Sequence, residues 1–144
     1  MNESKPFVIV ESLSSSQIQQ LHQLTTQQWW GKQRSLDDIR IMLEHTSLIL
    51  AVIDEQTGDL AGFCRVLTDF VFRATIFDVM VDDQHQGRGL GKRLIDALTD
   101  HPKLRRVAAI YLACEPNLEP FYQRWGFSPF NGRTGWMVKV QRPE

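Results

Sequence analysis

The spacing of apolar residues divides the first third of the chain into a strand and two helices. Residues 7–11 begin with four apolar residues and have the length of a strand. Two later segments carry apolar side chains three or four positions apart, which is the spacing of one helix face. These side chains are Ile18, Leu21 and Leu24 in the first segment, and Leu36, Ile39 and Leu43 in the second. We therefore expect two consecutive helices, the first of them ending near residues 29–31.

Both expected helices begin with a capping signal. Ser14 is followed three residues later by Gln17, and Ser35 is followed at the same spacing by Asp38. A serine hydroxyl at this position accepts a hydrogen bond from one of the unpaired N–H groups at the helix start. The two serines therefore predict where the helices begin.

Five further apolar runs have the length of strands. They occupy residues 48–54, 60–68, 75–81, 107–114 and 136–140. The turn residues Thr57, Gly58 and Asp59 predict that the first two runs form an antiparallel hairpin. The run at residues 107–114 is almost continuously apolar, so we expect a central strand that is covered on both faces.

Two more helices are expected in the second half of the chain. The first buries Leu90, Leu94, Ile95 and Leu98 and stops at His101 and Pro102. Because it joins two strand-like runs, it predicts a right-handed parallel crossover. The second is short, is capped by Asn117, tolerates Pro120 in its first turn and ends at Gly126.

The order of these elements predicts an α/β fold with a mixed sheet, of the α+β kind, in one domain over residues 1–144. The sheet should have six to seven strands and about four flanking helices. The chain has 144 residues, of which 42% are hydrophobic and 23% charged, and no linker divides it. This composition is typical of a globular domain that buries a sizeable core.

Charge and cysteine content exclude several classes of function. The formal net charge of -1 argues against nonspecific attachment to nucleic acid or to a membrane. Cys64 and Cys114 are too few for a disulfide framework or a zinc site, and we interpret both as core thiols. The four histidines show no metal-ligand spacing, so we expect no metal site. No apolar stretch has the length of a signal peptide or a membrane span, which predicts a cytoplasmic protein.

A glycine-rich segment between the run at residues 75–81 and the following helix is the strongest chemical signal. It reads Gln86, Gly87, Arg88, Gly89, Leu90, Gly91 and Lys92. Without side chains at three alternating positions, backbone N–H groups can approach an anion closely, and the helix start adds its unpaired donors. The segment predicts a phosphate site; the alternative is a glycine-rich turn without a ligand.

The residue pattern of this segment excludes two common phosphate-binding loops. A P-loop would need glycine at Gln86 and a hydroxyl side chain at Arg93. A dinucleotide-binding loop would need G-x-G-x-x-G after an opening strand, whereas these glycines lie past the middle of the chain. The remaining pattern is Q-x-x-G-x-G.

That pattern, preceded by Val79, Met80 and Val81, resembles the GNAT superfamily of acetyl-CoA-dependent N-acetyltransferases. The resemblance covers residues 60–128 and includes a Phe-Tyr-x-x-x-Gly-Phe segment at residues 121–127. It implies a GNAT-like fold, acetyl-CoA as cosubstrate, and an amine-bearing small molecule or peptide as acceptor. It leaves open whether the chain forms a homodimer.

The resemblance also implies roles for individual residues. Backbone N–H groups of residues 87–92 would bind the pyrophosphate of coenzyme A, and main-chain groups of residues 79–81 would bind its pantetheine arm like an added strand. Tyr122 would act as general acid toward the departing thiol. The alternatives are an ordinary paired strand at residues 79–81, and a core tyrosine whose hydroxyl is tied to the backbone.

A base must take the proton of the acceptor amine, whose ammonium form has no lone pair. Asp78 is the leading candidate because it lies within an apolar strand beside the glycine loop. Its alternative is a structural carboxylate bound to nearby backbone or to Arg65. Glu115, Glu119 and His85 are further candidates.

The sequence departs from the family at one position. Many members carry asparagine seven residues before the tyrosine, where this chain has Glu115; Asn117 follows two places later. Glu115 could face the acceptor as a base or lie solvated at the end of a strand. Trp29 and Trp30 lie where the family often builds its acceptor pocket, and we expect one in the core and the other at the pocket or surface.

Two functions are therefore considered. The first is an N-acetyltransferase in which a primary amine attacks acetyl-CoA directly. Cys114 lacks a histidine partner within sequence reach, so we expect no acyl-enzyme. The second is a noncatalytic acyl-CoA-binding sensor or interaction module.

Overall fold

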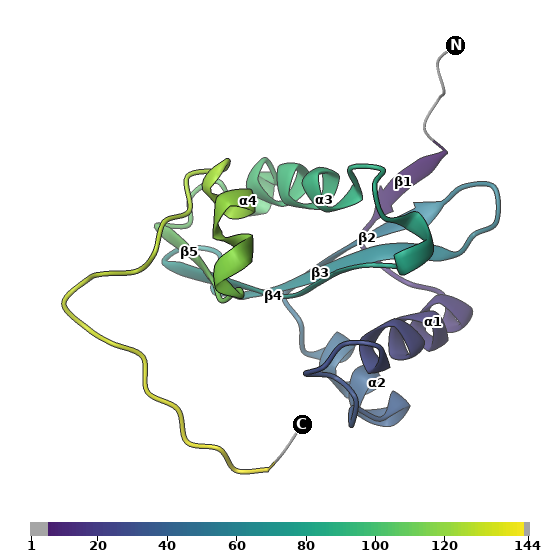
Figure 1. Ribbon diagram of the computed structural model, residues 1–144, viewed down its shortest axis with the longest axis horizontal. Coiled ribbons are helices and arrows are strands. Elements are labelled where there is room, and N and C mark those ends of the chain that lie inside the picture. Colours follow the sequence, from purple (N-terminus) through teal and green to yellow (C-terminus); the bar gives the residue numbers. More distant parts are fainter. Residues whose placement is uncertain (1–5, 143–144) are drawn as a thin grey trace.

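The computed structural model describes residues 6–142 and contains one five-stranded mixed sheet with four α-helices (Figure 1). The strands are β1 (Phe7–Val10), β2 (Leu48–Asp54), β3 (Leu60–Thr68), β4 (Arg73–Val81) and β5 (Ala109–Leu112). The helices are α1 (Ser15–Thr26), α2 (Leu36–Glu44), α3 (Leu90–Thr99) and α4 (Glu119–Gln123). Short 3₁₀ turns occupy Asp83–His85, Pro102–Leu104 and Pro116–Leu118.

The strands lie in their sequence order across the sheet. The pairs from β1 to β4 are antiparallel, and β5 joins β4 in parallel after the α3 crossover. Helices α3 and α4 cover one face of the sheet, and α1 and α2 cover the other (Figure 1). The expected antiparallel hairpin and the parallel pair are therefore both confirmed.

Each face of the sheet has its own core. The core under α3 contains Leu50 and Val52 of β2 together with Leu94 and Leu98 of the helix. The core under α1 and α2 contains Ala51, the β2 residue that lies between the first two. The alternation of side chains along a strand thus lets β2 supply both cores, and all of these residues are almost completely buried.

Local sequence signals set the beginnings of α1 and α2. The Ser14 hydroxyl accepts a hydrogen bond from the backbone N–H of Gln17, and the Gln17 side chain accepts one from the backbone N–H of Ser14. The Ser35 hydroxyl accepts in the same way from the Asp38 N–H. Both predicted caps are confirmed, as are the bounds of β2 and β3.

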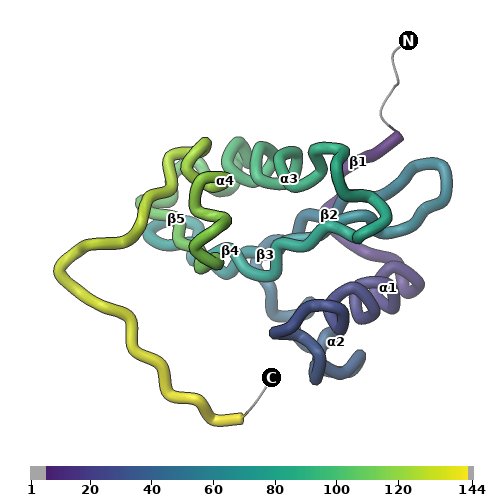
Figure 2. Tube along the Cα trace, viewed as in Figure 1, coloured from purple at the N-terminus to yellow at the C-terminus, as the bar shows by residue number. Residues whose placement is uncertain are grey.

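The expectation of six to seven strands is wrong for the described residues, because residues 136–140 form no strand. After α4 the chain leaves the sheet and runs extended before it turns back toward α2 (Figure 2). Its contact with β5 is made by aromatic rings: Tyr111 packs against Phe130 and Trp136 at centroid distances of 6.2 and 6.0 Å. Apolar side chains alone do not make a strand, because a strand also needs a partner's backbone along its edge.

Because residues 136–140 form no strand, the prediction of a central strand at residues 107–114 is also wrong. Strand β5 spans only Ala109–Leu112 and lies at the edge of the sheet, so it is not a central strand. All four of its residues are only partly buried. Its outer edge has no partner strand within the described chain, so its residues stay partly exposed.

Two helix boundaries also differ from expectation. Helix α1 ends at Thr26 instead of near residues 29–31, because the chain folds back in a series of turns in which Gly31 packs against Thr25. Asn117 lies within a 3₁₀ turn, and Leu118 occupies the N-cap of α4. Pro120 lies in the first turn of α4, as expected.

Candidate active site

Strands β4 and β5 pair over only four residues of β4. Their register runs from Arg73 opposite Ala109 to Ile76 opposite Leu112. Beyond this point β4 continues to Val81 while it pairs with β3 on its other side alone. Residues 79–81 therefore lie on the part of β4 that has no β5 partner, and this is the arrangement that the expected pantetheine contact requires.

The glycine loop directly follows this part of β4. The Gln86 side chain donates a 3.0 Å hydrogen bond from Nε2 to the carbonyl oxygen of Val81 and so fixes the loop to the strand end. Gly87 and Gly89 have φ angles of 79° and 73°, a backbone region that favours glycine. Gly89 is also the N-cap of α3, where no side chain caps the helix. The first N–H groups of α3 are thus left for another acceptor.

Helix α4 packs against the start of α3. A Cβ added to Gly91 would lie 3.5 Å from the Phe121 ring, so the small residue leaves room for this contact. At the other end of α4, Trp125 donates a 2.8 Å hydrogen bond from Nε1 to Asp96 of α3. This packing holds α4 beside the glycine loop.

The two basic residues of the loop have partners within the protein. The Arg88 guanidinium lies 5.9 Å from the centroid of the Phe7 ring. Lys92 forms an ion pair of 2.9 Å with Asp96, and its side chain is largely exposed. Both side chains lie at the surface of the loop, where their charge adds to the positive end of α3.

Tyr122 lies in α4 and is 7% exposed. Its ring packs between Phe121 and Phe127. Burial, together with the nearby thiols of Cys114 and Cys64, raises the pKa of Tyr122 to about 12. Within residues 6–142 its hydroxyl has no protein hydrogen-bond partner, so the backbone bond expected of a core tyrosine is not found there. The group keeps its proton at neutral pH and is available as a donor.

The two cysteines are poor nucleophiles. Burial raises the pKa of Cys64 to about 12, and partial burial together with the Glu119 carboxylate raises the pKa of Cys114. Both thiols therefore stay protonated at neutral pH. Cys64 is a core thiol as expected, but Cys114 is only partly buried because it lies beyond the end of the edge strand β5.

Asp78 lies in a β-bulge of β4. Between the pairs Phe63 with Met80 and Arg65 with Phe77, β4 has one residue more than β3. Asp78 adopts a φ angle of 58°, which is uncommon for a residue other than glycine. Such strained positions often mark functional sites.

The bulge directs the Asp78 carboxylate toward two arginines. Its Oδ2 atom accepts 2.8 Å and 2.7 Å hydrogen bonds from Arg34 and Arg65, and the Asp78 side chain is 7% exposed. The contact with Arg65 is the one that we expect if Asp78 is a structural carboxylate. Two ion pairs at one oxygen favour the interpretation that Asp78 positions the two arginines over the interpretation that it is the base.

The other candidate bases lie in different surroundings. Glu115 is exposed after β5 and accepts a 2.9 Å hydrogen bond from Trp29 Nε1. Glu119 lies in the first turn of α4. His85 lies between the carboxylates of Asp82 and Asp54, at 2.9 and 3.8 Å. These contacts give His85 a structural role beside the glycine loop.

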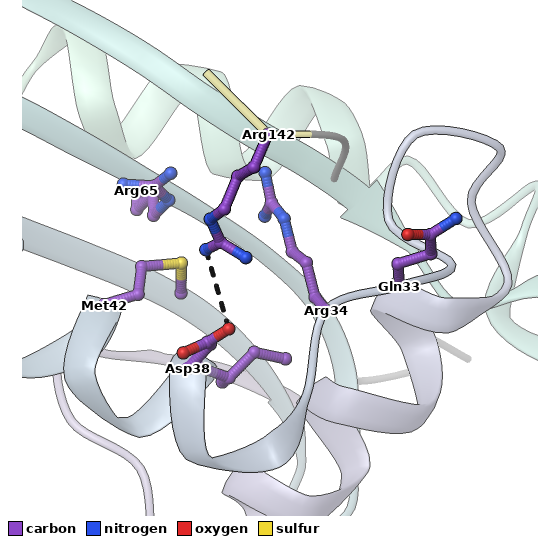
Figure 3. A pocket seen from close by; sticks show the side chains of 7 residues that line it. Gln33, Arg34, Asp38, Met42, Arg65 and Arg142 are labelled. Carbon is purple, nitrogen blue, oxygen red and sulfur yellow. Dashed lines mark ion pairs between the residues drawn. The ribbon is translucent and has the colours of Figure 1, made fainter. Parts of the chain in front are cut away.

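A cavity of about 160 Å³ opens between α2 and β3 (Figure 3). It is lined by Gln33, Arg34, Asp38, Ile39, Met42, Arg65 and Arg142. Trp30 packs against the core under α1 and beneath the Arg34 guanidinium, whereas Trp29 is 72% exposed. One tryptophan in the core and one at the surface is the expected division.

The sequence did not reveal this cavity as a unit. Its lining comes from four separate parts of the chain, and Arg142 reaches it from the extended segment after α4. Asp69 and Arg73 lie outside the lining and contact the turn between β3 and β4 instead. The backbone N–H groups of that turn bind Asp69 and lower its pKa.

Comparison with known proteins decides the family. The model of the acetyltransferase (GNAT) family matches residues 15–127, which include the glycine loop and Tyr122. The chain belongs to the GNAT family. It is therefore an N-acetyltransferase, and GNAT enzymes use acetyl-CoA to acetylate amine acceptors.

Two relatives show the extent of the GNAT similarity. An uncharacterised N-acetyltransferase, ycf52 of Porphyra purpurea, is 33% identical over 122 residues, which are 83% of this chain and 70% of that protein. The chloroplastic GCN5-related N-acetyltransferase 1 of Arabidopsis thaliana is 31% identical over 125 residues, which are 87% of this chain and 63% of that protein. Because one relative is chloroplastic, the cytoplasmic location stays a prediction.

A solved structure confirms the GNAT-like fold. A putative GNAT-family acetyltransferase from Xanthomonas campestris pv. campestris superposes with a TM-score of 0.80 and 28% identity. The match covers 92% of this chain and 93% of that one.

Among residues 6–142 no group of three or more His, Cys, Asp or Glu side chains is arranged to hold a metal ion. No helix in the same range has the length and apolar character needed to cross a membrane.

Proposed function

We propose that this GNAT enzyme transfers the acetyl group of acetyl-CoA to a primary amine by direct attack, with Tyr122 as the general acid. The observation that carries the proposal is the Tyr122 hydroxyl. It is held in a buried ring cluster on α4, keeps its proton, and has no hydrogen-bond partner within the described chain.

The residues fit a coenzyme at the glycine loop. We propose that N–H groups of residues 87–92 bind the pyrophosphate, because α3 begins there without a side-chain cap. We propose that main-chain groups of Val79, Met80 and Val81 bind the pantetheine arm along the part of β4 that β5 does not pair. Acetyl-CoA supplies the acetyl thioester, and the loop and strand hold it in place.

Tyr122 would donate its proton to the sulfur as the thiol leaves. A phenol with a pKa of about 12 is protonated across the physiological range, so the donor is present in nearly every molecule. Neither thiol supports an acyl-enzyme, because both stay protonated. The amine would therefore attack the acetyl carbon directly.

We propose Glu115 as the first acceptor of the amine proton. It directly follows Cys114, whose thiol is close enough to Tyr122 to raise the pKa of the phenol. Its side chain is exposed, and the Trp29 hydrogen bond fixes one of its oxygens. Asp78 instead holds Arg34 and Arg65, and we assign it a positioning role.

The experiment is a thiol-release assay with acetyl-CoA and a panel of small amines, polyamines and peptides. The enzyme should release thiol only when an amine acceptor is present, and Tyr122→Phe should reduce the rate by about a hundredfold, the usual scale of a lost general acid. A protein that binds acetyl-CoA but releases no thiol with any amine would support the noncatalytic sensor instead.

A further inference from the structure

We propose that the amine acceptor carries an anionic group, a carboxylate or a phosphate, which binds in the cavity at Arg65 and Arg142. The inference rests on the proposed function and names the chemistry of its acceptor. Figure 3 shows the guanidinium groups of Arg34, Arg65 and Arg142 gathered around one cavity.

Arg65 presents unused hydrogen-bond donors to this cavity. Its Nε atom donates to Asp78, and its two terminal nitrogens have no hydrogen-bond partner within residues 6–142. The side chain is 12% exposed and lines the cavity, so a ligand there can reach these donors. A guanidinium in this situation gains most from a carboxylate or phosphate, whose oxygens match its planar fork.

The Arg65 guanidinium is also held in a fixed orientation. It lies 5.0 Å from the centroid of the Phe77 ring, while Asp78 fixes its Nε side. Asp78 reaches it from the bulge, at a φ angle of 58°. An arginine that is fixed before its ligand arrives loses less conformational entropy on binding, which raises affinity for the anion.

Arg142 supplies the second cation from a separate part of the chain. It reaches the cavity from the segment after α4 and approaches Asp38 at 3.6 Å. This distance is longer than a strong charge-assisted hydrogen bond of about 2.8 Å, so the pair is loose. Its guanidinium therefore retains donors for an anion.

The size of the cavity limits what binds in it. The cavity has a volume of about 160 Å³, which is enough for several water molecules. It fits a carboxylate or phosphate on a short stem. A polyamine would bring further positive charge among the arginines and is disfavoured.

The position of the cavity connects it to the acetyl donor. Asp78, which holds Arg65, directly precedes Val79 in the part of β4 proposed to bind pantetheine. An anionic group bound at Arg65 would therefore keep the rest of a small acceptor next to that strand.

The test compares four primary amines of similar length: β-alanine, O-phosphoethanolamine, ethanolamine and putrescine. Calorimetry with the intact protein saturated with coenzyme A measures binding without turnover. We expect at least one anionic amine to bind about tenfold or more tightly than ethanolamine, as for other charge-assisted contacts. The ratio between β-alanine and O-phosphoethanolamine identifies carboxylate or phosphate as the better ligand.

Arginine variants link the preference to the cavity. Arg65→Met should abolish the difference between anionic and neutral amines, and Arg65→Lys should keep part of it. Arg142→Gln tests the site at a largely exposed position, 73% exposed, where folding is not at risk, and should weaken anion binding about threefold. Arg106→Gln, an exposed arginine outside the cavity, is the matched control and should change nothing.

Several outcomes would overturn the inference. For the wild type, these are equal binding of ethanolamine and the anionic amines, tighter binding of putrescine, or no binding of either anionic amine at millimolar concentrations. For the variants, the contradicting outcome is an anion preference that survives both Arg65→Met and Arg142→Gln. Thiol release with the same amines separates the two proposals. Selective anion binding without thiol release refutes the proposed function alone, whereas equal acetylation of ethanolamine and of both anionic amines refutes this inference alone.

Discussion

Trp29 donates a 2.9 Å hydrogen bond from its indole Nε1 to Oε2 of Glu115. The bond joins the segment between α1 and α2 to the loop between β5 and α4. It connects the part of the chain that lines the cavity with the part that carries Tyr122. One pair of substitutions, at Glu115 and at Trp29, therefore tests what this connection does.

Glu115→Gln keeps an oxygen that can accept the Trp29 hydrogen bond but removes the carboxylate charge. If Glu115 takes the amine proton, we expect the rate of acetyl transfer to fall by about tenfold or more, with the loss largest at low pH, where less of the amine is neutral. The pH profile of thiol release measures this. Trp29→Phe removes the bond but leaves the carboxylate, so the shape of its profile should match the wild type. A Glu115→Gln enzyme with the wild-type rate and profile would show that the residue is merely solvated.

Gly89→Glu should abolish coenzyme binding. The added carboxylate would lie at the N-cap of α3, where the pyrophosphate is proposed to bind, and would repel it. We expect affinity for coenzyme A to fall by about a hundredfold, equivalent to about 2.8 kcal/mol, in calorimetric titrations.

Gly58→Glu is the matched control for backbone strain. Gly58 has a φ angle of 79° in the turn between β2 and β3, and a Cβ there would meet no atom within 4 Å. It should cost similar strain without changing coenzyme affinity. Equal loss of affinity in both variants, or unchanged affinity in Gly89→Glu, would remove the loop from the proposed site.

Asp78→Asn distinguishes a positioning residue from a base. The amide cannot pair with two guanidinium groups, so we expect the free energy of unfolding to fall by roughly 3 kcal/mol and the KM for the acceptor to rise. The kcat should fall less than the ratio kcat/KM, and its pH dependence should stay as in the wild type. A large fall of kcat with an altered pH profile would instead identify Asp78 as the base.

The buried phenol and thiol predict a loss of stability in alkali. The pKa of Cys64 rises from 9.0 to about 12 on folding, and that of Tyr122 rises from 10.0 to about 12. Because the unfolded chain releases these protons first, both groups stabilise the fold fully below about pH 9, and this contribution is lost as pH rises toward 12. Urea denaturation at pH 8 and pH 11 measures the loss. Cys64→Val should lose less stability than the wild type between these two values.

The sequence predicted the elements that depend on neighbouring residues. The Thr-Gly-Asp turn specified the hairpin of β2 and β3, and the serine caps specified the starts of α1 and α2. The motif that contains the glycine loop and Tyr122 also pointed to the family, and both lie within the residues that the family model matches. Their roles stay predictions.

Features that depend on distant residues were not predictable in this way. The apolar pattern of residues 136–140 suggests a strand, but whether a strand forms depends on an edge that the pattern does not contain. The cavity joins Arg34, Arg65 and Arg142, which lie far apart in the sequence. The bulge at Asp78 was not predicted either, because an aspartate within an apolar run does not by itself specify a positive φ angle.

The extra residue at Asp78 reverses the inside and outside of β4 halfway along its length. Ile76 belongs to the core under α3, and Met80 belongs to the core under α1 and α2, although residues an even number of positions apart normally share a face. Deleting residue 78 would therefore leave both cores in register, because regular alternation from Ile76 would still place Val79 on the α3 side and Met80 on the side of α1 and α2. What the shortened strand would lose is the carboxylate shared by Arg34 and Arg65, so the extra residue serves the two arginines and not the packing of the interior.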